Sequence, residues 1–212
     1  MRVTSVNLGS AETVHLGDRA VRTGIGKRPV DRAVVNSRGV VDDEVVDTRH
    51  HGGTDQAVYL YSLEDYEWWA GELGRDDLHP GLFGENLTVD LDGHGPLRVG
   101  DRLRIGSSVE LEVTAPRIPC AVFANAVGED RWVARFNEAR RHGAYCRVLT
   151  GGVVSVGDRI RHRGGDPAFP DVEELADLHL DPRADVDRLR VALAAPVAER
   201  TRVDLERRLA RA

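Results

Sequence analysis

The chain has 212 residues, of which 41% are hydrophobic and 30% are charged, and its formal net charge at pH 7 is −6. A chain of this length buries about 70% of its unfolded surface, so its core needs no disulfide or metal staple. The acidic balance argues against binding of nucleic acid through bulk positive charge, and no run reaches the roughly eighteen apolar residues of a membrane span. We therefore expect a soluble protein with neither nucleic acid nor a membrane as its partner.

The first residues and the cysteines indicate the compartment. Residues 1–6 alternate as in a strand, so we expect no signal peptide. Cys120 and Cys146 are the only cysteines and form no Cys-x-x-Cys pair, which argues against a disulfide framework and against a structural zinc site. A cytoplasmic location is the expectation that follows.

Strands dominate the first 165 residues. A turn that begins with Gly-Asp and feeds a strand occurs three times, at residues 17–18, 100–101 and 157–158. Ser107-Ser108 predicts a hairpin turn, and Ser62 predicts the N-cap of a helix that ends near Glu72, with a second helix at residues 129–139. The remaining apolar alternation predicts strands at residues 2–7, 33–36, 56–61, 85–89, 109–115 and 144–149. The fold class is therefore mainly β with inserted helices, arranged as a mostly antiparallel barrel or curled sheet.

The composition changes after residue 163, where a Gly-Gly-Asp-Pro run predicts a linker. Asp171, with Glu174 three residues later, predicts the capped start of a helix. Apolar residues then repeat at helical spacing, and two prolines divide them into three helices. We expect a β domain at residues 1–165 and a small three-helix domain at residues 170–212. The second is too small to be stable alone, so it should pack on the first or on a partner.

Cys120 ends the pentapeptide Pro116-Arg117-Ile118-Pro119-Cys120, in which two prolines stiffen an extended backbone. A thiolate is a nucleophile and a soft metal ligand, and a nearby cation such as Arg117 lowers the pKa of a thiol. A lone cysteine is also commonly a small buried hydrophobe, so the pentapeptide alone leaves both interpretations open. For Cys146, inside a predicted strand, we expect a buried structural thiol.

Three further segments carry residues suited to a ligand. Lys27 is the only lysine and follows Gly24-Ile25-Gly26, which suits an anion such as phosphate but lacks the spacing of a Walker loop. His50 and His51 precede Gly52-Gly53, which places an imidazole on a tight turn that can approach a ligand, or on a solvated surface turn. Asn86 offers a donor and an acceptor to a heterocycle edge, or caps its own loop.

Together these segments resemble the MOSC family, the domain that ends molybdenum cofactor sulfurases and also occurs in small bacterial proteins. The likeness is closest to the bacterial subgroup that reduces N-hydroxylated bases such as 6-hydroxylaminopurine. Where this subgroup has a glycine, the chain has Asp42. The resemblance implies a MOSC-type β-barrel core, with a three-helix tail like the family's small C-terminal helical domain. The matching stretches occur in family order at residues 24–30, 43–53, 83–88, 116–120 and 145–149.

The resemblance also implies a molybdenum cofactor (molybdopterin), and no pyridoxal phosphate is expected. The implied reaction is the two-electron reduction of an N–OH group with loss of water. A separate flavin or iron-sulfur reductase would supply electrons, because the sequence has no flavin or nicotinamide fingerprint. The implied roles are a molybdenum ligand for Cys120, phosphate contacts for Lys27 and Arg117, pterin contacts or support for His51, Gly52 and Asn86, and proton delivery for His51 or His50.

Two other functions stay open at this point. Cys120 could carry a persulfide in a sulfur-carrier or cofactor-handling module, or the chain could be a binding domain without catalysis. The oligomeric state is also open, with a homodimer among the alternatives.

Overall fold

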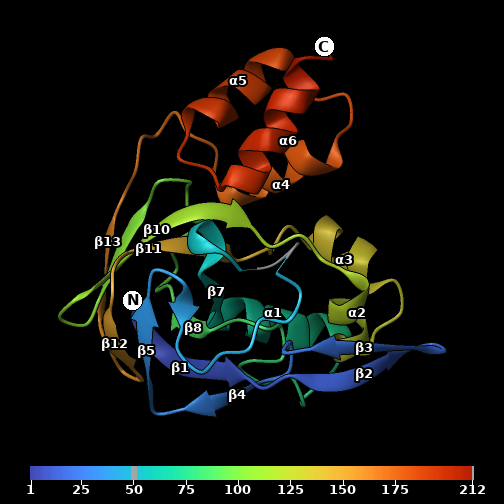
Figure 1. The fold of residues 1–212 in the computed structure, drawn as a ribbon, viewed down its shortest axis with the longest axis vertical. Coiled ribbons are helices and arrows are strands. Elements are labelled where there is room, and N and C mark those ends of the chain that lie inside the picture. The colour runs from blue at the N-terminus through green and yellow to red at the C-terminus, as the bar shows by residue number, and fades with distance from the viewer. Residues whose placement is uncertain (49–51, 212) are drawn as a thin grey trace.

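The protein is described by a computed structural model that covers residues 1–48 and 52–211. Its centre is an eight-stranded sheet in the order β13-β9-β10-β11-β7-β8-β1-β4 (Figure 1). Neighbouring strands are antiparallel, except that β7 and β8 are parallel. The strands are β1 (Arg2–Gly9), β4 (Lys27–Val30), β7 (Val58–Ser62), β8 (Leu87–Asp90), β9 (Arg102–Ile105), β10 (Val109–Pro116), β11 (Ala144–Thr150) and β13 (Ile160–Arg163).

The sheet curls until β1, the strand beside the edge strand β4, meets the turn before β13. The N–H of Val3 in β1 donates to the carbonyl of Asp158 at 2.9 Å, and the N–H of Gly157 donates to the carbonyl of Val3 at 2.8 Å. These bonds join β1 to the turn before β13, so β13 has β9 on one side and β1 near its start on the other. Alternate side chains such as Val6 and Leu111 fill the interior and are fully buried. The expected β-barrel-like core is confirmed.

Two smaller sheets accompany the main one. A three-stranded sheet joins β12 (Gly152–Ser155), β5 (Arg32–Asn36) and β6 (Gly39–Val40). The second is a hairpin of β2 (Glu12–Leu16) and β3 (Arg19–Thr23), which projects from the body (Figure 1). Gly17 turns this hairpin with a φ of 59°, as its Gly-Asp sequence predicted.

The helices α1 (Leu63–Leu73), α2 (Ala121–Val127) and α3 (Trp132–Ala139) connect strands, and a buried aromatic cluster lies among them. Ser62 caps α1 as predicted, because its Oγ accepts from the N–H of Asp65 at 2.9 Å. The predicted helix at 129–139 is wrong at its start, where Arg131 has a φ of 54° and α3 begins one residue later. The predicted strand at 56–61 also starts too early, because the 3₁₀-helix η1 (Thr54–Gln56) precedes β7.

The C-terminal segment forms α4 (Val172–Leu180), α5 (Val186–Ala194) and α6 (Glu199–Leu209), grouped over one end of the sheet (Figure 1). The predicted cap is confirmed: the N–H of Glu174 donates to Asp171 at 2.8 Å, and the N–H of Asp171 donates to Glu174 at 2.9 Å. Val99, from the loop before β9, is buried in the same apolar cluster as these helices. The division at residues 165–170 stays a prediction. Within the described residues, no helix is long and apolar enough to cross a membrane.

Candidate functional site

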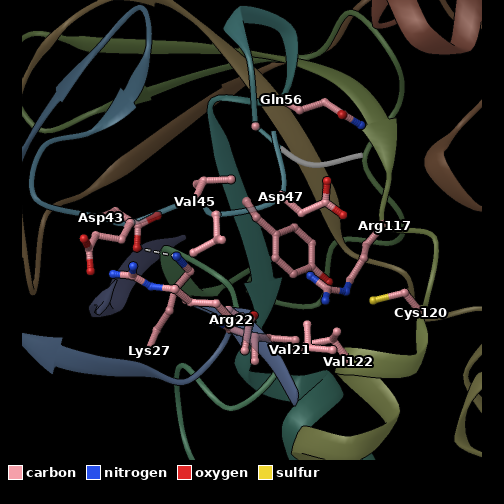
Figure 2. A pocket seen from close by; sticks show the side chains of 18 of the residues that line it. Val21, Arg22, Lys27, Asp43, Val45, Asp47, Gln56, Arg117, Cys120 and Val122 are labelled. Atoms are coloured by element: carbon pink, nitrogen blue, oxygen red, sulfur yellow. Dashed lines mark hydrogen bonds and ion pairs between the residues drawn. The ribbon is translucent and has the colours of Figure 1, made fainter. Parts of the chain in front are cut away.

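A cavity of about 520 Å³ opens between the β2–β3 hairpin, the segment before η1 and the start of α2 (Figure 2). Five of the residues selected from the sequence line it: Lys27, Gly52, Asn86, Arg117 and Cys120. They come from four separate stretches of chain, so the fold brings most of the predicted site together. His50 and His51 lie outside the described residues, and their roles stay predictions.

Cys120 is the residue immediately before α2. Its extended backbone, with φ −133° and ψ 171°, agrees with the stiff segment that the prolines predicted. The thiol is partly exposed, and its Sγ points into the cavity toward the guanidinium of Arg117 (Figure 2). Cys146, in contrast, is fully buried in β11, where burial raises the pKa of its thiol well above the usual value. Of these two thiols, only Cys120 is placed to meet a ligand.

Arg117 is a buried cation at the cavity. The Cζ atom of Arg117 lies 4.3 Å from the ring centre of Phe123, and Nη1 of Arg117 lies 3.5 Å from the hydroxyl oxygen of Tyr145. Its Nε is buried without a hydrogen-bond partner, and in the described part of the chain no carboxylate forms an ion pair with it. A buried charge without a counter-charge is costly, so this guanidinium suits an anionic group in the cavity.

Asp43 and Lys27 lie together at another side of the cavity (Figure 2). Asn86 also lines the cavity and bonds to Asp43. Oδ1 of Asp43 forms an ion pair with the ammonium of Lys27 and accepts from the N–H of Gly9 at 2.7 Å. Its Oδ2 accepts from Nδ2 of Asn86 at 2.9 Å, while Oδ1 of Asn86 accepts from the N–H of Tyr59 at 3.1 Å. We call Lys27, Asp43 and Asn86 the Asp43 node. Lys27 therefore already has a counter-ion, and the bonds of Asn86 favour support of the site over a contact to a heterocycle.

The two buried cations differ in how firmly they keep their charge. Burial lowers the pKa of Lys27, although the charge and hydrogen bond of Asp43 oppose this effect. Arg117 stays charged at any ordinary pH because guanidinium is a much stronger base. Arg117 is thus the permanent positive charge beside Cys120, and Lys27 is a buried ammonium whose charge depends on Asp43.

Backbone packing explains the glycine motif near Lys27. A Cβ on Gly24 would lie 2.0 Å from the carbonyl oxygen of Glu44, so only glycine lets these two segments meet. This close approach, rather than a phosphate loop, accounts for Gly24. Asp42 adopts a φ of 68°, the left-handed conformation that glycine favours and that Asp tolerates. Asp42, in place of the glycine of the family pattern, therefore still allows the turn.

Sequence reasoning missed two parts of the cavity. Asp43 stood in a matching stretch but was assigned no role, although the only lysine of a chain needs a counter-charge when it is buried. The β2–β3 hairpin contributes Val21 and Arg22 to the wall, and its period-two alternation was the available signal. Among the described residues, no group of three His, Cys, Asp or Glu side chains could hold a metal ion.

Comparisons with known proteins give the relatives of this chain. The sequence model of the MOSC domain matches residues 47–161, just over half of the chain. Uncharacterized protein YflK of Bacillus subtilis is 37% identical over 156 residues, which span 73% of this chain and 70% of that protein. Protein YiiM of Escherichia coli is 33% identical over 102 residues, 46% of this chain and 45% of that protein. A protein of Gibberella moniliformis named Reductase is 34% identical over 127 residues, 59% of this chain and 22% of that protein.

Solved structures share the fold over nearly the full length. YiiM from Geobacillus stearothermophilus superposes with a TM-score of 0.79 at 23% identity and covers 98% of each chain. YiiM from Escherichia coli superposes with a TM-score of 0.75 at 22% identity and covers all of this chain and 94% of that one. The shared fold therefore includes the C-terminal helices.

Proposed function

Because this chain belongs to the MOSC family, we propose that it is a molybdenum-cofactor-dependent reductase of N-hydroxylated compounds such as 6-hydroxylaminopurine. The observation that carries the proposal is a partly exposed thiol, Cys120, beside the buried guanidinium of Arg117, which has no carboxylate partner among the described residues, on one cavity. The printed name of the Gibberella relative, Reductase, points the same way. We place the protein in the cytoplasm, where a separate reductase would meet it.

The residues at the cavity fit such a cofactor. A thiolate such as that of Cys120 is a suitable ligand for a soft, redox-active metal, and the pterin of the cofactor would supply further donors. The Nε of Arg117 has no hydrogen-bond partner among the residues that the structure describes, and it suits an anionic group such as a cofactor phosphate. The exposed apolar side chains of Val45 and Val46 line the same cavity and offer a surface for a flat heterocycle.

In this proposal the bound cofactor supplies two-electron redox chemistry. The net reaction breaks the N–O bond, forms an N–H bond and releases the oxygen as water, and it consumes two electrons and two protons. Electrons come from a separate flavin or iron-sulfur reductase. Cys120 would bind the metal, and the positive charge of Arg117 would stabilise a negative group near the thiolate. The Asp43 node would support the cavity wall. His51 or His50 is proposed to deliver a proton, since an imidazole titrates near neutral pH.

The test is a Cys120→Ser variant expressed with molybdate. We expect loss of molybdenum and of 6-hydroxylaminopurine reduction, measured with a chemical reductant. Mutation of a residue that supports a metal ligand lowers metal affinity or activity about 10–100-fold. Loss of the ligand itself should therefore lower both by more than about 100-fold. The matched control is Cys146→Ala, which removes the other, buried thiol and should retain molybdenum and turnover.

The outcomes separate the alternatives. Full reduction by Cys120→Ser would refute the mechanism. A wild-type protein that carries persulfide on Cys120 but no molybdenum would be a sulfur carrier or cofactor-handling module. Absence of molybdenum, pterin and persulfide would leave a binding domain.

A further inference from the structure

The start of α6 contacts the cavity wall from outside. Nη1 of Arg200 donates to the side-chain oxygen of Gln56 at 2.8 Å, and Nη2 donates to the carbonyl of Thr48 at 2.7 Å. Gln56 lines the cavity, and so does Asp47, which directly precedes Thr48 (Figure 2). One guanidinium from the C-terminal helices therefore joins two points of this wall that are eight residues apart.

A second set of contacts fixes α6 itself. Its N-cap residue, Ala198, has no side-chain acceptor, and the N–H of Glu199 donates instead to Oδ2 of Asp55 at 2.9 Å. Asp55 also pairs with Arg147 at 3.2 Å, and Nη2 of Arg147 donates to the carbonyl of Val197 at 3.3 Å. The helix start thus depends on a residue of η1, and η1 adjoins the cavity.

The charge of Arg200 also acts within the site. Burial raises the pKa of Tyr145, and the positive charges of Arg117 and then Arg200 oppose that effect. Tyr145 lines the cavity, and its hydroxyl contacts Arg117. Arg200 is therefore close enough to influence a phenol that lies beside the proposed anion partner.

We propose that Arg200 is a positioning residue of the cavity: it fixes the wall at Thr48 and Gln56, so that the C-terminal helices complete the site. The ligand in the cavity is that of the proposed function, on which this part of the inference rests. The fork geometry matters, because a guanidinium reaches two acceptors at once and a lysine ammonium is a point charge.

The first test uses the cofactor-free protein and needs no activity. The amides of Thr48 and Gln56 donate to the carbonyls of Val46 and Gly53, so their hydrogen exchange reports on the wall. In Arg200→Ala we expect both amides to exchange about 10-fold faster, as for loss of one net hydrogen bond to a charged group. Arg200→Lys should restore part of this protection. The matched control is Arg207→Ala, an exposed arginine of the same helix, and it should change nothing.

The second test measures molybdenum content in protein expressed with molybdate. Arg200→Ala should lower it about 10-fold or more, and adding Gln56→Ala should cost little further, because both changes break the same contact. Unchanged amide exchange in Arg200→Ala, or an equal effect of Arg207→Ala, would overturn the inference. If wild-type protein bound no molybdenum, the proposed function would fail, while the exchange result would still decide the role of Arg200.

Discussion

Asp43 is the residue whose loss should have the largest effect on the cavity wall. Its side chain is 5% exposed and that of Lys27 is 7% exposed, so the ion pair is nearly buried. Asp43→Asn leaves the ammonium without a counter-charge, and we expect the free energy of unfolding at pH 7 to fall by about 3 kcal/mol. Urea unfolding measures this loss. Asp42→Asn, at an adjacent exposed carboxylate whose left-handed backbone Asn tolerates, should be nearly neutral.

The pH dependence of the Asp43→Asn variant follows from Lys27. Burial lowers the pKa of Lys27 in the folded state, and loss of Asp43 lowers it further. At pH values between the lowered pKa of Lys27 in the variant and the ordinary value of 10.5, the unfolded chain binds more protons than the folded chain. The stability of the variant therefore rises with pH in this range. The loss caused by Asp43→Asn should therefore be larger at pH 7 than at pH 9.5. An equal loss at both pH values would show that Lys27 is not the group left unpaired.

At the residue scale, local sequence revealed the groups with their own chemistry but not their partners. Cys120 was identifiable because the prolines that present it are its chain neighbours. The ion pair between Lys27 and Asp43 was not, because it joins β4 to a loop that only the sheet brings together. The adjacent histidines gave a signal of the same kind as Cys120, and they lie outside the described residues.

The β2–β3 hairpin is the element that we expect to close the cavity from the side. Val21 of β3 is half-buried and lines the cavity, whereas Ala20 is exposed on the other face. Val21→Asp places a negative charge where an anionic cofactor is proposed, and we expect at least about a tenfold loss of cofactor affinity, or about 1.4 kcal/mol. Pterin and molybdenum content measure it. Ala20→Asp introduces the same side chain in the same strand and should retain both, and an equal loss there would point to damage of the hairpin instead.

At the element scale, the long strands and the capped helices were predictable and the short elements were not. Ser62 and Asp171 carry their caps in the sequence, so α1 and α4 began where expected. The four-residue strand β4 contains Pro29 and pairs with β1 at the sheet edge, so its place depends on a distant partner. The seven-residue helix α2 is too short to show a clear helical period, and its start depends on the chain direction set after Pro119.

The whole molecule is held together by contacts between the barrel and the C-terminal helices. Val99 is buried among the apolar residues of these helices, and the N–H of Ala198 donates to the carbonyl of Thr114 in β10 at 3.1 Å. A segment of about 40 residues is too small to be stable without such support. We therefore expect the proposed domains 1–165 and 170–212 to unfold as one cooperative unit.

Leu205→Ala tests this expectation. Leu205 is 2% exposed in the core of the C-terminal helices, so its truncation should cost about 2–5 kcal/mol, whereas Val203→Ala at a 42% exposed site of the same helix should cost under about 0.5 kcal/mol. In a cooperative molecule, Leu205→Ala lowers the temperature of the one thermal transition by about 2–4 °C per kcal/mol. Trp69 of α1 and Trp132 of α3 pack against each other in the aromatic cluster beside the sheet, so tryptophan fluorescence reports on the barrel side. A shift in helical circular dichroism without a matching shift in fluorescence would show that the C-terminal helices unfold on their own, and Arg200 would then lose its contacts before the barrel opens.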